Sequence, residues 1–171
     1  MERVPEKKPI SKELKELFEA DQADRIAIRR RWDDRELTEK MMENDSLRLK
    51  RAREIYDDYI VSKVSLSNQE LVQLAFLFQH SSESDDYRKA QELAGAAGDE
   101  GKWMAAAAED RWLLSQGKEQ KWGTQFVSET EQAPMLPDEE SGITDDMRAE
   151  RDIPPRAEQL AVHRSISERE V

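Results

Sequence analysis

Six polar residues interrupt apolar stretches of this chain in a pattern that could support chemistry: Asp21, Arg25, His80, Asp110, Arg111 and Gln125. Burying such groups is costly unless they are paired, so we expect them to meet one another or a ligand inside the fold. An imidazole moves protons near neutral pH, a carboxylate can orient it, and an arginine can hold an anionic group. His80 is therefore the candidate proton carrier, with Asp21 or Asp110 orienting it.

A structural role stays open for each of these residues taken singly. A histidine at the C-terminal end of a helix is stabilised by the helix dipole. Asp21 and Arg25 are four residues apart and can form an ordinary helix-surface pair. The segment 122–125 can be a tight turn in which Gly123 supplies the positive φ. The combination of the six residues favours chemistry more than any one of them does.

The first predicted helix must position Asp21 and Arg25. It runs from Ser11, as its N-cap, to about Asp33, and apolar residues recur along it at steps of three and four, namely Leu14, Phe18, Ile28 and Trp32. Asp21 and Arg25 fall in the middle of this stripe, where the helix is expected to face the core. A second helix is predicted over about residues 46–60.

The third predicted helix places His80 at its end and forms the centre of the domain. Ser67 and Glu70 have the spacing of a capping box, and the run 71–78 that follows is apolar on nearly every face. Further helices are predicted from Ser84 to about residue 97 and over about residues 102–115, with Asp110 on the inner face of the latter.

The chain is predicted to be mainly α, a single-domain irregular helical bundle around a central apolar helix. A turn at 120–125 leads into a possible short extended segment near 124–127, and weaker helical turns follow over about 147–151 and from about 156. Residues 11–127 are predicted to be the helical core domain, 1–10 a flexible N-terminus, and 128–171 a loop and C-terminal helical tail that pack on the core.

Composition excludes several classes of function. The chain has 171 residues, with 27 Lys plus Arg against 38 Asp plus Glu, and a net charge of −11 opposes binding to nucleic acid. The absence of cysteine excludes disulfides and thiolate sites. No stretch approaches about 18 consecutive apolar residues and the N-terminus has no signal-peptide pattern, so we expect no membrane association and a cytoplasmic location.

Motifs for common cofactors are missing from the sequence. There is no H-x-x-x-H, E-x-x-H or D-x-D-x-D-G spacing for a metal, and no G-x-G-x-x-G, G-x-x-x-x-G-K-[ST] or G-x-S-x-G. We therefore expect neither a metal site nor a cofactor.

Four short motifs give the chain a family resemblance. Asp21-Gln22 with Arg25, Gln79-His80, Asp110-Arg111, and the run from Gln120 to Gln125 resemble the D-Q-x-x-R, Q-H, D-R and Q-x-[YW]-G-T-Q motifs of a family catalogued only as a domain of unknown function. The likeness covers about residues 14–160 and includes an Arg-containing segment like that at Arg148. It implies a mostly helical fold with a shared polar cluster, and it transfers no reaction.

The leading hypothesis is a small cofactor-free enzyme that uses His80-centred general acid–base chemistry on a polar or anionic small molecule, by hydrolysis, elimination or cyclisation. The predicted substrate-binding residues are Arg25, Arg111, Gln79, Gln120, Thr124, Gln125 and Arg148. The alternative is a non-catalytic protein-interaction or regulatory module in which the polar cluster is a buried structural network. An enzyme should offer a pocket reached by His80, whereas a module should expose an apolar or acidic patch elsewhere.

Overall fold

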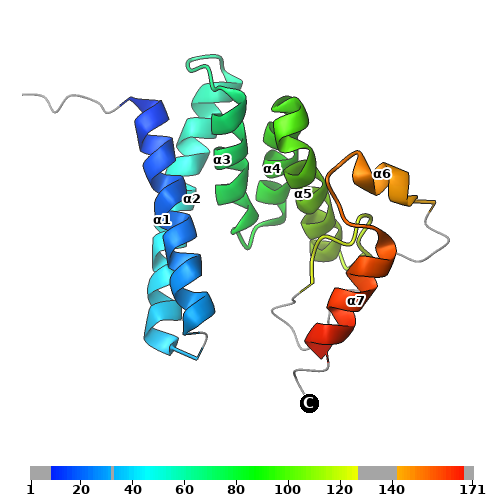
Figure 1. Ribbon diagram of the computed structural model, residues 1–171. Coiled ribbons are helices and arrows are strands. Elements are labelled where there is room, and N and C mark those ends of the chain that lie inside the picture. Colours follow the sequence, from blue (N-terminus) through cyan, green and yellow to red (C-terminus); the bar gives the residue numbers. More distant parts are fainter. Residues whose placement is uncertain (1–8, 32, 127–141, 168–171) are drawn as a thin grey trace, which may run out of the picture.

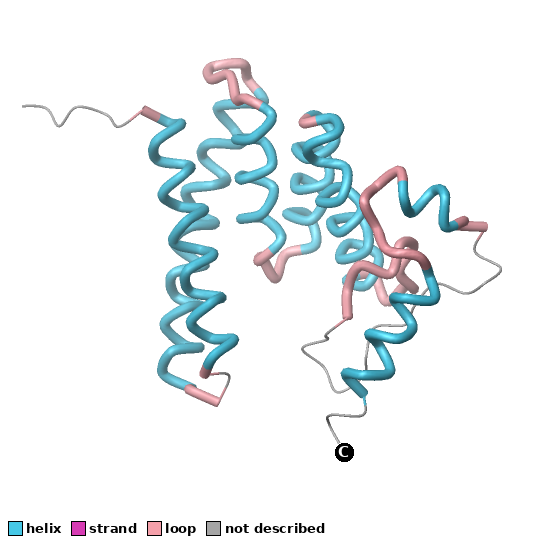
Figure 2. The backbone as a smooth tube through the Cα atoms, viewed as in Figure 1, coloured by secondary structure: helices cyan, strands magenta, loops and turns pink. Residues whose placement is uncertain are grey.

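The computed structural model describes residues 9–31, 33–126 and 142–167, the last five by their backbone alone (Figure 1). In chain order the helices are α1 (Ile10–Arg30), α2 (Arg35–Ile60), α3 (Asn68–Gln79), α4 (Ser84–Ala96), the 3-10 helix η1 (Gly98–Gly101), α5 (Lys102–Ser115), α6 (Asp145–Ala149) and α7 (Arg156–Ser167). Within these ranges there are helices and loops but no strand (Figure 2). The prediction of a mainly α helical bundle is confirmed.

The extended segment predicted near 124–127 is not a strand where the structure describes it. Residues 124–126 have irregular backbone, and Val127 lies outside the described residues. The backbone N–H and hydroxyl of Thr124 and the side-chain amide of Gln125 donate hydrogen bonds to α5, which satisfy these groups without a partner strand.

The helix α1 begins one residue before the predicted cap. Pro9 occupies the cap position, and its carbonyl oxygen accepts hydrogen bonds from the backbone N–H groups of Lys12 and Glu13, both at 3.1 Å. Ser11 therefore lies inside the first turn. Leu14 and Asp21 are buried at 0% and 1% exposure, so the mixed apolar and charged stripe does face inward.

The helix α2 begins at Arg35, about eleven residues before the start predicted from periodicity. The carboxylate of Asp34 caps it by accepting a hydrogen bond from the backbone N–H of Leu37 at 3.0 Å. The lower half of the α1–α2 hairpin projects past the end of α3 in Figure 1. On the inner face of this half only Leu37 and Met41 are apolar, and Asn44 and Asp45 follow them, so the apolar repeat is too short to predict a helix.

The helix α3 is the centre of the bundle, as its sequence predicts. The capping box is present: Glu70 accepts from the backbone N–H of Ser67 at 2.7 Å, and Ser67 accepts from that of Glu70 at 3.4 Å. This helix contacts α1, α2, α4 and α5. Its buried apolar side chains are Leu71, Leu74, Ala75, Leu77 and Phe78.

Two glycines shape the connection between α4 and α5. Gly98 has φ of +62°, which ends α4. A Cβ atom on Gly101 would lie 2.0 Å from the carbonyl oxygen of Ala94, so η1 can approach α4 this closely because residue 101 has no side chain.

The C-terminal elements α6 and α7 follow α5 in the chain (Figure 1) and contact it mainly through the turn at Trp122 and Gly123. A small second core joins Ala106 of α5 to Trp122 and Ile153, with Ile143 and Met147 at its edge. No helix in the described ranges has the length and apolar character needed to cross a bilayer.

Candidate functional site

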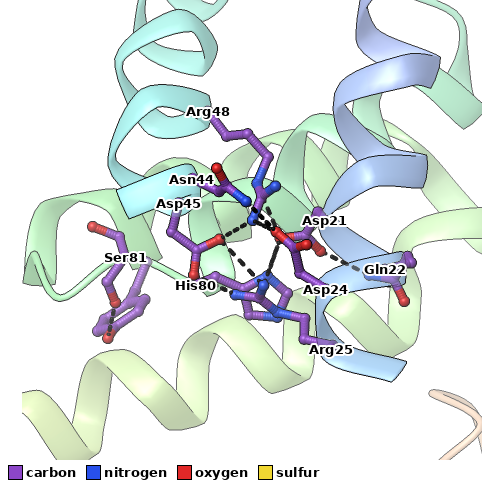
Figure 3. A network of polar contacts seen from close by, with 10 residues as sticks. Asp21, Gln22, Asp24, Arg25, Asn44, Asp45, Arg48, His80 and Ser81 are labelled. Carbon is purple, nitrogen blue, oxygen red and sulfur yellow. Dashed lines mark hydrogen bonds and ion pairs between the residues drawn. The ribbon is translucent and has the colours of Figure 1, made fainter. Parts of the chain in front are cut away.

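The centre of the candidate site is a direct contact between α1 and the end of α3. The Nδ1 atom of His80 lies 2.9 Å from Oδ1 of Asp21 (Figure 3). Phe18 and Phe76, one helical turn away on the same two helices, pack edge to face with ring centroids 5.5 Å apart. This apolar contact sets the spacing of the helices, so it also fixes the distance between the carboxylate and the imidazole.

The carboxylate of Asp21 lies among donors from Gln22, Arg25 and His80, and Nε of Arg48 lies 3.9 Å from its Oδ1. Gln22 donates its amide to Oδ2 at 2.9 Å, and Nη1 of Arg25 lies 3.1 Å from Oδ1. A carboxylate among donors acts as an acceptor, so we assign the proton of the neutral imidazole to Nδ1. The remaining ring nitrogen, Nε2, then carries a lone pair, and it forms no hydrogen bond to any described residue.

Electrostatics favour the neutral form of His80. Burial lowers its pKa from the usual 6.5, Asp21 acts in the opposite direction, and the positive charges of Arg25 and Arg111 lower it further. The side chain is 19% exposed, so solvent still reaches part of it. The imidazole is therefore a neutral base at neutral pH.

Arg25 is held between two carboxylates. Besides Asp21, it contacts Asp45 of α2 through Nη1 at 3.2 Å and Nη2 at 2.8 Å (Figure 3). A fork of this kind is a strong and directional ion pair. The structure therefore brings Arg25 to His80, as predicted, but commits its guanidinium to protein carboxylates.

The network continues into α2 through residues that sequence reasoning missed. Nη2 of Arg48 lies 2.6 Å from Asp45 and 2.8 Å from Asp24, and Asn44 donates to Asp24 at 3.0 Å. Arg48 is buried, at 6% exposure. Because the start of α2 was predicted near residue 46, Asn44 and Asp45 fell outside the helix. The i,i+3 spacing of Asp45 and Arg48 is the signal that could have found them.

Arg111 of α5 is the second cation beside His80. Its charge reaches the imidazole and lowers the pKa of His80. It is half-buried, and no hydrogen bond or ion pair joins it to another residue in the described ranges. Met104 and Ala108, seven and three residues before it, are buried in the main core, so this face of α5 points toward the bundle.

Asp110 does not join His80 but organises the turn that follows α5. It is fully buried, and its carboxylate accepts from the backbone N–H groups of Lys121, Trp122 and Thr124 at 2.7, 2.9 and 2.9 Å. Burial raises the pKa of Asp110, and these hydrogen bonds act in the opposite direction. Of the two acids expected to orient His80, the structure places Asp21 there.

Gln120, Thr124 and Gln125 belong to this second cluster. Gln120 and Gln125 exchange hydrogen bonds: the Gln120 amide donates to the carbonyl oxygen of Gln125 at 2.9 Å and accepts from its backbone N–H at 2.8 Å. The amide of Gln159 in α7 donates to the carbonyl oxygens of Trp122 and Gly123 at 2.8 and 3.1 Å. Gln120, Thr124 and Gln125, which were predicted to bind substrate, thus hold the 120–125 turn in place.

The remaining two predicted residues lie apart from the imidazole network. Arg148 is 1% exposed and donates to the carbonyl oxygen of Ile143 at 2.8 Å and to Asp145 at 3.1 Å. Gln79 precedes His80 and is 4% exposed, and its amide nitrogen has no hydrogen-bond partner in the described part of the chain.

A buried acid also fixes the loop that follows His80. Asp86 is 1% exposed and accepts from Ser81 and Lys89, both at 2.7 Å, and from Arg53 of α2. Burial acts to raise the pKa of Asp86, but its hydrogen bonds to Arg53, Lys89 and Ser81 outweigh this and lower it. Both ends of the His80 segment, α3 and the 81–83 loop, are therefore anchored.

A surface depression of about 400 Å³ lies at the other end of α3 from His80. It is lined by Tyr59, Ile60, Ser62, Val64, Ser65 and Leu66 in and before the α2–α3 connection. None of the candidate residues lines it. Among the described residues, no group of three or more His, Asp or Glu side chains is arranged to hold a metal.

No family model, curated protein or solved structure matches the chain. The family resemblance in the motifs around His80 and Gln125 stays a prediction.

Proposed function

We propose that the protein is a small cofactor-free enzyme in which His80 and Asp21 perform general acid–base chemistry on a small anionic molecule. The observation that carries this proposal is the 2.9 Å contact between His80 Nδ1 and Asp21 Oδ1, which leaves Nε2 uncommitted to any described side chain. A general base needs a lone pair, a fixed direction and a pKa near the working pH.

The chemistry follows from the protonation state of the pair. Asp21 fixes the Nδ1–H tautomer, so Nε2 can take a proton from a substrate or from water. The imidazolium formed in this way is stabilised by the adjacent carboxylate, and it can return the proton to a leaving group. Hydrolysis, elimination and cyclisation all require that a proton is removed from one group and returned to another.

The anionic character of the substrate is inferred from Arg111. A half-buried guanidinium loses hydration, and it is normally compensated by a carboxylate. Arg25, Arg48 and Arg53 each have such a partner, whereas Arg111 has none in the described ranges. A carboxylate or phosphate group of a substrate would supply the missing charge next to the imidazole.

A non-catalytic interaction module remains the second candidate, and exposed apolar side chains on the α1–α2 hairpin favour it. Ile26, Met42 and Leu47 are 51%, 63% and 70% exposed. In that case the Asp21–Arg25–Asp45 network would serve to fix the pairing of the two helices.

Anion binding can be tested without a known substrate. The pKa of His80 would be followed by NMR of its imidazole protons, with sodium acetate or sodium sulfate added at constant ionic strength. A bound anion should raise this pKa by stabilising the imidazolium. Arg111→Gln should abolish the response, while Arg29→Gln, at an exposed site on α1, should retain it. An equal response in Arg111→Gln would contradict the assignment.

Catalysis itself is tested by turnover. Small carboxylic acids, esters and phosphate esters would be incubated with the protein and followed by ¹H NMR. For any compound that the wild type consumes, His80→Gln should lower the rate at least about 100-fold, the usual contribution of a general acid or base. His163→Gln, which removes the other histidine of the sequence, is the matched control. Unchanged turnover in folded His80→Gln would exclude His80 as the proton carrier.

A further inference from the structure

Arg25 is the link between the proposed catalytic pair and α2. Its Nη1 atom lies 3.1 Å from Oδ1 of Asp21, the same oxygen that lies 2.9 Å from His80 Nδ1. Two donors, one from Arg25 and one from His80, therefore share one carboxylate oxygen. The position of the guanidinium decides how much of that oxygen is available to the imidazole.

Asp45 determines where the guanidinium sits. It accepts from Nη1 and Nη2 of Arg25 at 3.2 and 2.8 Å, whereas Arg25 reaches Asp21 through Nη1 alone. Asp45 is itself fixed by Arg48 at 2.6 Å. Burial acts to raise the pKa of Asp45, but hydrogen bonds and charges from Arg25 and Arg48 outweigh this and lower it, so Asp45 is ionised at neutral pH.

We propose that Asp45 is a positioning residue of the catalytic pair: it draws the Arg25 guanidinium toward α2 and so reserves Asp21 for His80. This inference rests on the proposed function for its catalytic meaning, although the geometry it describes can be tested on its own. Arg25 is then a positioning residue as well, and Arg111 is left as the cation that meets the substrate.

Removing Asp45 should change how Arg25 and His80 share the carboxylate of Asp21. Without its two-pronged partner, the Arg25 guanidinium would turn to the nearest remaining carboxylate, which is that of Asp21. It would then compete with Nδ1 of His80 for Oδ1, and its charge near the imidazole would no longer be offset by Asp45. Both effects disfavour the imidazolium.

Removing Arg25 should have the opposite result. In Arg25→Gln the imidazole loses a neighbouring positive charge, and His80 becomes the nearest donor to Oδ1 of Asp21, which Nε of Arg48 approaches only to 3.9 Å. Both effects favour the imidazolium. The groups that face this site are Asp21, Asp24 and Arg25 from α1, Asp45 and Arg48 from α2, and Arg111 from α5. Both variants retain the ion pair of Arg48 with Asp24.

The experiment is an NMR titration of His80 in the full chain, with the signal assigned by comparison with His163→Gln. We expect Asp45→Asn to lower the pKa of His80 and Arg25→Gln to raise it, each by at least about 0.5 unit. In the double variant the two shifts should largely cancel. Arg35→Gln and Glu39→Gln remove the two halves of an exposed ion pair on the same helix, 2.8 Å across, and should leave the titration unchanged.

A merely structural network predicts a different result. If Asp45 only stabilised the helix pair, loosening would let water in, and both variants would move the pKa of His80 upward toward 6.5. An upward shift or no shift in Asp45→Asn would therefore overturn the positioning role. Thermal unfolding of each variant would verify that it is folded at the temperature of the titration. The catalytic role of His80 fails on a separate measurement, the turnover of His80→Gln.

Discussion

Asp110 and Thr124 are joined twice, because one carboxylate oxygen, Oδ2, accepts from the backbone N–H of Thr124 at 2.9 Å and from its hydroxyl at 2.7 Å. The other oxygen accepts from two further backbone N–H groups. Four donors thus converge on a single buried side chain. Asp110 does for the 120–125 turn what an N-cap residue does for a helix, since it satisfies backbone groups that would otherwise be buried without partners.

The first prediction concerns this carboxylate. Asp110→Asn places an NH₂ group against some of these donors, and we expect a loss of about 2–4 kcal/mol in the free energy of unfolding. Thr124→Val removes the hydroxyl donor alone and should cost about 1 kcal/mol. Urea denaturation followed by circular dichroism would measure both. A change below about 0.5 kcal/mol in Asp110→Asn would contradict a structural role for the acid.

The second prediction concerns the pH dependence of stability. The unfolded chain binds a proton at His80 near pH 6.5, whereas folding lowers that pKa, so below about pH 6.5 the unfolded state binds more protons than the folded state. Stability should therefore fall as the pH is lowered from 7.5 toward 5, with a slope from this group of at most about 1.4 kcal/mol per pH unit. His80→Gln should have a shallower slope in the same window. Equal slopes for the wild type and His80→Gln would show that His80 has the same pKa in the folded and unfolded states.

The third prediction uses two glycines that differ in their surroundings. An added Cβ at Gly95, inside α4, meets nothing within 4 Å, so Gly95→Ala should stabilise the protein by about 0.5–1 kcal/mol through its effect on helix propensity. At Gly101 the same atom would lie 2.0 Å from Ala94 O, and Gly101→Ala should destabilise by at least about 2 kcal/mol because η1 must move away from α4. Melting temperatures should shift in opposite directions. A tolerated Gly101→Ala would mean that the contact between η1 and α4 is looser than described.

The fourth prediction concerns Arg148. Its Nε and Nη2 atoms are buried and have no hydrogen-bond partner among the described residues, although Nη1 is paired. A buried guanidinium in this condition is costly, and replacement by an apolar side chain of similar length can be neutral or stabilising. We expect Arg148→Met to change the free energy of unfolding by less than about 1 kcal/mol and Arg148→Ala, which leaves a void, to lose about 2 kcal/mol or more. Equal losses in the two variants would show that the charge itself stabilises the fold.

Much of the fold could be predicted because the relevant signals are local. The capping box at Ser67 and the apolar run after it identify α3, and the glycines near residue 98 mark the break before α5. The start of α2 was not predicted, since the inner face of the projecting half changes from the apolar Leu37 and Met41 to the polar Asn44 and Asp45 and so carries no long apolar repeat. Hydrophobic periodicity indicates which face of a helix is buried, so it does not predict a helix whose side chains are mostly exposed to solvent.

The site was predictable in part. Asp21 and His80 stand out as polar residues on inward faces, and the structure joins them across 59 residues of chain. Asp110 stood out for the same reason, yet three of its four donors are backbone N–H groups, which no residue pattern displays. Asp45 and Arg48 are ordinary surface types in sequence. Their i,i+3 spacing marks them as a pair on one helix. That they also join Asp24 and Arg25 of α1 depends on which helices become neighbours, which the spacing does not contain.

The clamp formed by Gln159 on the carbonyl groups of Trp122 and Gly123 has a consequence for the order in which the protein folds. Helices α3, α4 and α5 contact their neighbours along the chain, so their loops close cheaply and the contacts can form early. In the clamp, Gln159 contacts Trp122 and Gly123, which lie 37 and 36 positions earlier in the chain. The clamp also needs the turn that Asp110 holds in place. The last helices should therefore dock late, and amide hydrogens of α7 should exchange with solvent before those of α3.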